Sequence, residues 1–197
     1  MGNQESDAVK PLMPVISYRI DLKNNSRRVA LVGVYSAAYV AVVYLFPFIS
    51  YGQLNIRVAD FLRGLLPFFP EPLIIGNALA TFLSDLSSPF GYFDFIGSTL
   101  VIIVSITIAT RIFRLRFRGN IAAGYIAHAL ILSTWLTTLI SSSALGSFHF
   151  LDSSWFTFAP WIYGGNAISD IVLPYAFFQV LKGRLAYPGR LPSQANG

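Results

Sequence analysis

The chain has 197 residues, of which 54% are hydrophobic and 12% are charged, and its mean hydropathy is +0.59. Because a soluble domain carries about 25% charged residues, this composition excludes an ordinary water-soluble globule. The formal net charge of +5 does not indicate a nucleic-acid partner, since the cations lie at the ends of apolar runs, where the positive-inside rule places them. The absence of cysteine excludes disulfides, thiolate metal sites and cysteine nucleophiles.

Four long runs contain no Asp, Glu, Lys or Arg, and a bilayer-spanning helix needs about 20 mostly apolar residues. These runs cover residues 29–56, 95–110, 121–151 and 153–169. The pattern predicts transmembrane helices over 28–47, 93–113, 120–141 and 159–182. The segment between the first two contains Pro67, Pro70 and Pro72, and proline interrupts a helix. We therefore expect two short helices there, over 58–69 and 71–85.

The distribution of positive charge indicates six helices. The positive-inside rule places Arg27 and Arg28, and with them the N-terminus, on the cytoplasmic side. Six helices then also place the basic run 111–118 and the pair Lys182 and Arg184 on that side. Five helices would place the basic run outside. We therefore predict an all-α membrane protein with six transmembrane helices, the second and third short, and both termini cytoplasmic. The predicted domains are a polar cytoplasmic tail (1–25), a transmembrane substrate-binding domain (26–185) and a cytoplasmic tail (186–197). The outer loops, where a pocket would open, are 50–57, 86–94 and 142–158.

Ionisable side chains near or within apolar helices are candidate functional residues, because a bilayer accommodates them at a cost. Arg57, Asp60 and Arg63 recur at every third position, so they share one side of the second predicted helix. Asp60 either neutralises the two arginines or joins them in binding a planar polar ligand. Asp85 ends the third helix, where the helix dipole disfavours a carboxylate. It therefore needs a partner, which can be an arginine or a ligand donor.

Four further polar or aromatic residues are substrate-site candidates. Asp94 opens the fourth helix, where it is either a helix-capping acid or a ligand-binding one. Asn166 and Asp170 lie four residues apart on the last helix, and packing alone explains an acid such as Asp170 poorly. Tyr92 belongs either to the interfacial aromatic belt or to a surface that stacks on a flat heterocycle.

Asn77 and His128 are more typical of packing between membrane helices than of ligand binding. Two histidines and scattered acids give neither metal-ligand spacing nor a Ser-His-Asp set. We therefore expect no metal, no cofactor and no catalytic residue.

The first predicted helix carries a stripe of small residues that lets another helix approach closely. The stripe consists of Ala30, Gly33, Ala37 and Ala41. It is either a packing face within this chain or a docking face for a partner subunit.

Residues 51–100 contain an ordered set of short motifs. The set is Tyr51-Gly52, Arg57-Val-Ala-Asp60, Leu66-Pro67-Phe68-Phe69-Pro70, Gly76, Ser88-Pro89-Phe90-Gly91, Asp94, Gly97 and Ser98. In order and spacing it resembles the core of the queuosine-precursor transporter (QueT) family, whose members resemble S components of energy-coupling factor (ECF) transporters. Two positions depart from the family pattern: Asp60 stands where Glu is usual, and Asp85 where an uncharged polar residue is usual.

The resemblance implies a multi-pass plasma-membrane subunit, not an enzyme, that captures a 7-deazaguanine such as preQ0 or preQ1 from the outer side. A guanine-like edge presents two adjacent N–H donors beside a carbonyl, so a carboxylate can accept both donors while Arg57 donates to the oxygen. The carboxylate candidates are Asp60, Asp85, Asp94 and Asp170. The resemblance also implies that the small-residue stripe docks to a transmembrane coupling subunit. Two ATPase subunits would supply energy, because this chain has no phosphate-binding loop of the G-x-x-x-x-G-K-[ST] type.

Other hypotheses stay open. A self-sufficient proton-coupled or facilitative carrier would use Asp170 and His128 in a proton relay, although the internal repeat common in such carriers is missing. An S component for a different vitamin-like substrate would keep the architecture and change the ligand. A membrane-embedded enzyme would need a denser cluster of catalytic groups than this sequence offers.

Overall fold

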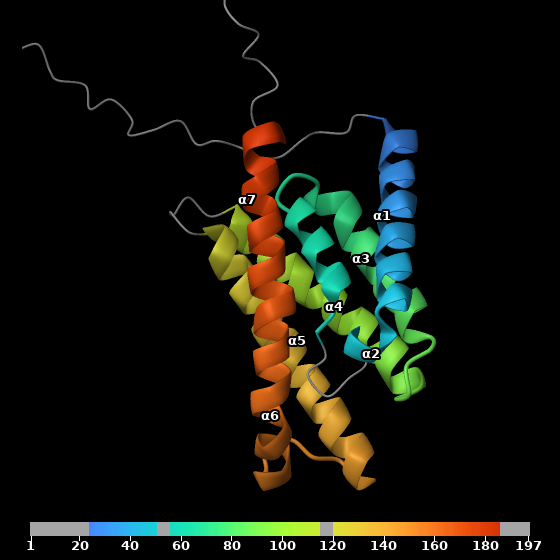
Figure 1. Ribbon diagram of the computed structural model, residues 1–197, viewed down its shortest axis with the longest axis vertical. Coiled ribbons are helices and arrows are strands. Elements are labelled where there is room, and N and C mark those ends of the chain that lie inside the picture. Colours follow the sequence, from blue (N-terminus) through green and yellow to red (C-terminus); the bar gives the residue numbers. More distant parts are fainter. Residues whose placement is uncertain (1–23, 51–55, 115–119, 186–197) are drawn as a thin grey trace, which may run out of the picture.

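The computed structural model describes residues 24–50, 56–114 and 120–185, and these residues form helices and short connections with no strand among them (Figure 1). The predicted all-α class is thus confirmed. The elements are α1 (Asn25–Leu45), α2 (Pro47–Ser50), the 3-10 helix η1 (Val58–Leu65), α3 (Pro70–Asp85), α4 (Tyr92–Phe113), α5 (Asn120–Leu145), α6 (Ser153–Asn166), the π-helix η2 (Ala167–Val172) and α7 (Leu173–Leu185). Most of both predicted tails, the motif Tyr51-Gly52 and part of the basic run, residues 115–119, lie outside the described residues.

Three helices in the described part of the chain are long and apolar enough to cross a membrane, namely α1, α4 and α5. The elements α6, η2 and α7 follow one another without a break, and Figure 1 shows them as one long rod. The first residues of α1 and the last of α7 lie at the same end of the molecule. The count of six spans and the cytoplasmic side of the termini stay predictions.

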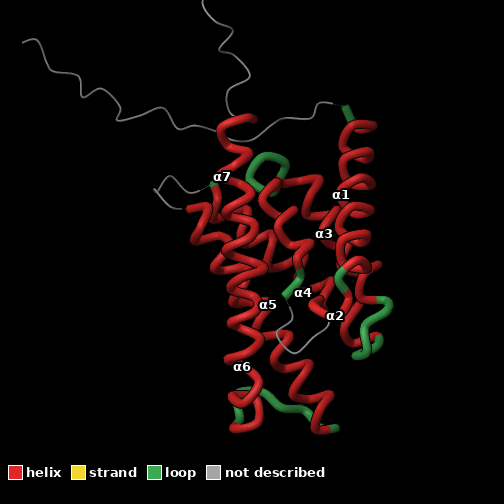
Figure 2. Tube along the Cα trace, in the orientation of Figure 1, coloured by secondary structure: helices red, strands yellow, loops and turns green. Residues whose placement is uncertain are grey.

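The last predicted outer loop, 142–158, is largely helical, and that part of the prediction is wrong. Helix α5 continues to Leu145, and α6 begins at Ser153 because the Asp152 side chain caps it, accepting a hydrogen bond from the backbone N–H of Trp155 at 2.8 Å. Pro160 lies inside α6 but does not end it. Figure 2 shows that only a short connection joins the two helices.

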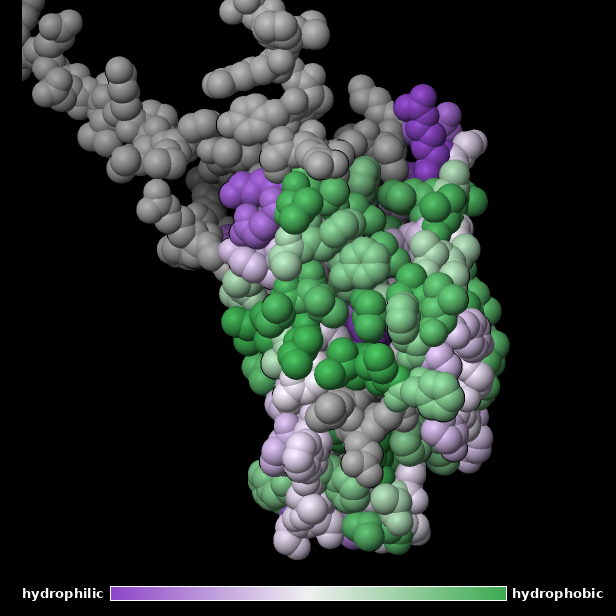
Figure 3. Space-filling model, viewed as in Figure 1, coloured by the Kyte–Doolittle hydropathy of each residue, from purple (hydrophilic) through white to green (hydrophobic). Residues whose placement is uncertain are grey.

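The helices pack in series: α1 against α3, α3 against α4, α4 against α5, and α5 against α6. The buried apolar core includes Tyr39, Val43, Leu73, Ile106 and Ile162. The outer faces remain strongly apolar, with exposed side chains such as Val34, Leu100 and Val172. Figure 3 shows these apolar surfaces as a broad band, with hydrophilic residues at the upper end of α1. This distribution is that of a protein surrounded by lipid.

The 3-10 helix η1 occupies the middle of the fold, where it packs against α1, α3, η2 and α7. Its approach to α7 is close enough to require glycine: a Cβ at Gly64 would lie 2.6 Å from the carbonyl oxygen of Pro174 and 2.9 Å from the backbone nitrogen of Phe178. A 3-10 helix has three residues per turn. Arg57, Asp60 and Arg63 therefore lie in one row along η1 and its N-cap.

The π-helix η2 interrupts the regular hydrogen-bond ladder between α6 and α7. Pro174 has no N–H with which to bond the carbonyl oxygen of Asp170, four residues earlier, so the regular helix cannot continue unchanged there. The wider π turn places Asp170 at the surface that faces η1. Such single π turns occur frequently at functional sites.

Candidate functional site

The charged row on η1 is buried. Arg57, Asp60 and Arg63 are 6%, 1% and 0% exposed. Charged side chains are almost never fully buried unless they are paired, so the partners of this row define the candidate site. These partners form two clusters, an inner one around Arg63 and an outer one around Arg57.

In the inner cluster, Arg63 joins η1 to the last helical rod. Its Nη2 lies 3.0 Å from Oδ1 of Asp60, and its Nη1 forms an ion pair with Oδ1 of Asp170 in η2. The hydroxyl of Tyr39 on α1 donates to Oδ1 of Asp60 at 2.5 Å. The Nε of Arg63 donates to Oδ1 of Asn77 on α3 at 3.2 Å. One guanidinium therefore connects four separate elements of the fold.

His128 on α5 completes the inner cluster. Its Nε2 lies 3.0 Å from Nη1 of Arg63, and a guanidinium can only donate, so Nε2 is the acceptor in this contact. The proton of the neutral imidazole is then on Nδ1, which lies 2.8 Å from the hydroxyl of Ser105 on α4. Nε2 also lies 3.6 Å from Oδ1 of Asp170. Sequence reasoning assigned Asn77 to packing, placed His128 beside Asp170 only in the carrier hypothesis, and missed the contact of both residues with Arg63.

In the outer cluster, Arg57 forms a two-pronged ion pair with Asp85 at the end of α3. The Nη2–Oδ1 distance is 2.9 Å and the Nη1–Oδ2 distance is 3.4 Å. This answers the question that the sequence left open, because the partner that offsets the unfavourable dipole at Asp85 is an arginine. The ion pair also fixes the N-terminal end of η1 to α3.

Asp94 is the second acid of the outer cluster, and it lies in the first turn of α4. Gly91 holds the N-cap position, so Asp94 is a first-turn acid and not the cap. Its carboxylate accepts hydrogen bonds from the hydroxyls of Ser88 and Ser98, both at 2.5 Å. The indole N–H of Trp135 donates to the Ser98 hydroxyl at 3.1 Å. Hydroxyl donors thus surround this buried carboxylate.

Three buried polar atoms have no hydrogen-bond partner within the described part of the chain. They are the hydroxyl oxygens of Ser50 and Thr81 and the Oδ2 atom of Asp170. Buried polar groups are nearly always bonded, so each exception needs an explanation such as a ligand or water. Among the described residues, no three His, Cys, Asp or Glu side chains lie together as a metal site requires.

Two predicted site residues lie apart from the clusters. The amide of Asn166 donates to the hydroxyl of Ser133 at 3.0 Å, so it connects α6 to α5. Tyr92 is 60% exposed, and its ring lies beside that of Phe93 with the centroids 4.3 Å apart. The structure brings together the other five predicted residues, Arg57, Asp60, Asp85, Asp94 and Asp170.

The small-residue stripe on α1 faces outward. Ala30, Gly33, Ala37 and Ala41 are all exposed, and a Cβ at Gly33 would meet nothing within 4 Å. Packing within the described part of this chain therefore does not account for the stripe. It leaves a flat, apolar helix face on the surface of the molecule.

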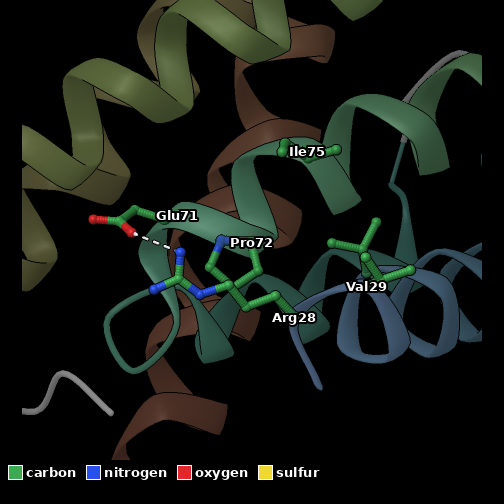
Figure 4. A pocket seen from close by; sticks show the side chains of 6 residues that line it. Arg28, Val29, Glu71, Pro72 and Ile75 are labelled. Atoms are coloured by element: carbon green, nitrogen blue, oxygen red, sulfur yellow. Dashed lines mark ion pairs between the residues drawn. The ribbon is translucent and has the colours of Figure 1, made fainter. Parts of the chain in front are cut away.

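A groove of about 240 Å³ lies between the beginnings of α1 and α3 (Figure 4). It is lined by Arg28, Val29, Val32, Glu71, Pro72 and Ile75. Arg28 and Glu71 form an ion pair across it at 3.9 Å. The lining contains none of the cluster residues, so this groove is separate from the candidate site.

The family model described as QueT transporter matches residues 29–183. No curated protein and no solved structure matches the chain. The matched range contains both charged clusters and nearly all of α1.

Proposed function

The chain belongs to the QueT transporter family, a family of membrane transport proteins with small-molecule substrates, and from this we propose that it is the S component of an ECF-type importer. In this role it captures a 7-deazaguanine such as preQ0 or preQ1 at the outer side of the plasma membrane. The observation that carries the proposal is the buried row of Arg57, Asp60 and Arg63, which forms ion pairs with carboxylates on two other elements, Asp85 on α3 and Asp170 in η2. Intramembrane charges of this kind mark ligand pathways.

The outer cluster has the chemistry to recognise a guanine-like edge. Such an edge offers two N–H donors beside one carbonyl acceptor, and a carboxylate next to a guanidinium is its complement. Arg57 and Asp85 supply this pair at 2.9 Å. An analogue that lacks one of these groups leaves a buried polar atom unpaired, which costs about 1–3 kcal/mol. Selectivity for the deazaguanine edge follows from that penalty.

The exposed stripe on α1 is the proposed docking face for the transmembrane coupling subunit. A row of small residues allows close contact between helix backbones, which is how membrane helices associate without a hydrophobic driving force. Gly33 and Ala37 lie at its centre, about one turn apart and both exposed. Two ATPase subunits complete the proposed assembly and supply the energy for release of the ligand into the cell.

A binding titration of the detergent-purified chain tests the ligand. Calorimetry and thermal shift are measured with preQ0, preQ1, guanine and unrelated vitamins. We expect saturable, stabilising binding of a deazaguanine, lost in Asp85→Asn and retained in the matched control Glu71→Gln, whose side chain is 47% exposed. Binding of a vitamin instead would identify an S component for a different substrate. A folded protein that binds none of these compounds would refute the proposal.

A second candidate function is a self-sufficient proton-coupled carrier, and the observation that favours it is the pairing of His128 with Asp170 inside the fold. Uptake into proteoliposomes separates the two functions. The S-component proposal predicts uptake only when the coupling and ATPase subunits are present with ATP. Uptake by this chain alone, driven by a proton gradient, would establish the carrier.

A further inference from the structure

The groove between α1 and α3 changes from charged to apolar along both of its walls. Arg28 and Glu71 face each other where the two helices begin, and Val32 and Ile75 lie four residues further along α1 and α3. The helices run in the same direction, since the contacts between them advance along both helices together. At a rise of 1.5 Å per residue, the charged and apolar levels are about 6 Å apart. A ligand that matches this order has a charged end and an apolar end.

The charged end of the groove carries an excess of positive charge. The beginnings of α1 and α3 and the end of α4 meet here, because the two oxygens of the Glu71 carboxylate each lie 3.9 Å from an arginine, Arg28 and Arg114. The described residues of these three helix ends hold four arginines and this one acid, the other two arginines being Arg27 and Arg111. One carboxylate does not balance four guanidiniums, and exposed ion pairs contribute little stability. This end therefore attracts an anion.

The rest of the lining is apolar and open to the surroundings. Val29 is 70% exposed and Ile75 is 62% exposed, and they lie on opposite walls of the groove (Figure 4). The remaining apolar lining residues are Val32 and Pro72. The volume of about 240 Å³ is several times the roughly 30 Å³ that one water molecule occupies in the liquid, so the groove has room for a short stretch of hydrocarbon chain. A soluble anion would leave this apolar part uncovered, whereas an anion that carries a hydrocarbon chain would cover it.

We propose that the groove is a binding site for an anionic phospholipid. Arg28 binds the phosphate group, because a guanidinium presents its N–H donors in a fork that matches phosphate oxygens. The first carbons of one acyl chain lie against Val29, Val32 and Ile75. Basic pockets between membrane helices bind anionic headgroups, and the bound lipid joins the beginnings of α1 and α3. Val32 and Ala37 are about 140° apart around α1, so the lipid and the small-residue stripe occupy different sides of this helix.

Thermal unfolding in a neutral detergent, followed by tryptophan fluorescence, tests the chemistry of the ligand. The midpoint is measured against rising concentrations of phosphatidylglycerol, of phosphatidylcholine with the same chains but no net charge, and of glycerol phosphate, which is anionic but has no chains. A ligand of the folded state raises the midpoint. We expect phosphatidylglycerol to bind at least about fivefold more tightly than phosphatidylcholine, the factor that one arginine contributes near an anionic lipid. Glycerol phosphate should cause no shift.

Four variants test the location of the site. Arg28→Gln removes a charge from the groove, and its control Arg111→Gln removes the same charge from the same end of the fold but outside the lining. Val29→Trp fills the groove, and its control Val34→Trp enlarges a valine of α1 that is also 70% exposed but lies outside the lining. We expect Arg28→Gln to reduce the preference for phosphatidylglycerol to at most about twofold and Val29→Trp to abolish its stabilising effect. Both controls should behave as the unmodified protein.

Several results would overturn the lipid site. Equal stabilisation by phosphatidylcholine would mean that the groove does not select for charge, and stabilisation by glycerol phosphate would identify a site for soluble anions. An equal loss in Arg111→Gln would assign the effect to the overall charge of this end. If folded protein shows no lipid effect, or keeps it in both Arg28→Gln and Val29→Trp, the groove is not a lipid site and is left to a protein partner.

Discussion

Replacement of Arg63 tests whether the inner cluster is held together by balanced charge. The guanidinium pairs with Asp60 and Asp170, and all three side chains are at most 2% exposed. Arg63→Met keeps much of the side-chain volume but leaves both carboxylates without their cation. Removing one partner of a buried ion pair costs about 3–5 kcal/mol. We therefore expect the free energy of unfolding to fall by at least about 3 kcal/mol.

Thermal unfolding of the detergent-purified protein, followed by the fluorescence of its three tryptophans, measures this loss. For a chain of this length, 1 kcal/mol shifts the midpoint by about 2–4 °C, so the expected decrease is at least about 6 °C. A triple variant that adds Asp60→Asn and Asp170→Asn removes the unbalanced carboxylates, and it should recover more than half of the lost stability. Such recovery is strongly non-additive, as expected for side chains in contact. The reasoning is refuted if the triple variant is less stable than Arg63→Met.

Three further predictions concern other parts of the fold. Gly64→Val forces a Cβ to within 2.6 Å of a backbone oxygen of α7, so thermal unfolding should show that the free energy of unfolding falls by about 1–3 kcal/mol. The control Gly33→Ala places its Cβ in open space and should be neutral or slightly stabilising. Ala37→Leu should leave ligand binding intact but abolish co-purification with the coupling subunit; retained assembly would contradict the docking face. The hydrogen bond with His149 lowers the pKa of the Asp152 carboxyl group. The ionised carboxylate therefore stabilises the folded protein. This contribution is complete above the ordinary pKa of about 3.9 and is lost as the pH falls through the lowered pKa. Asp152→Asn should remove that part of the acid dependence of the unfolding temperature.

Hydropathy and proline spacing predicted most of the helices, because these signals are local. The uncharged runs correspond to α1, α4 and α5, and the break at the prolines separates η1 from α3. The beginning of α6 was predicted six residues too late. Its first turn is fixed by the Asp152 cap, and the hydropathy pattern placed no weight on that polar residue.

The partners within the site could be predicted only in part, because they depend on packing between distant segments. The spacing of Arg57, Asp60 and Arg63 indicated a shared face, and the position of Asp85 indicated that it needs a partner. The pairing of Arg63 with Asp170 joins residues 107 positions apart, and it results from the packing of η1 on η2. No periodicity encodes such a contact. The carrier hypothesis linked His128 to Asp170, but the isolation of His128 in an apolar helix gave no sign of its contact with Arg63.

The different fates of Asn166 and Asp170 show how one change in helix type alters a site. In an α-helix, residues four apart lie on the same face, and the sequence therefore placed these two side chains together. The π-helix Ala167–Val172 hydrogen-bonds five residues apart, so residues four apart no longer align. Asn166 consequently bonds to α5, while Asp170 reaches Arg63 on η1.

The same reasoning explains why the charged row requires a 3-10 helix. An α-helix turns by about 100° per residue, so side chains at every third position drift by about 60° per step. On an α-helix, Arg57 and Arg63 would point about 120° apart, and one of them would face away from its partner. With three residues per turn the row is straight, so Arg57 can meet Asp85 while Arg63 meets Asp170. The two ion pairs in turn favour the 3-10 form over the length of η1, which exceeds the usual three or four residues. Charge spacing and helix type therefore support each other, and the row that carries the candidate site is also what fixes η1 in the middle of the fold.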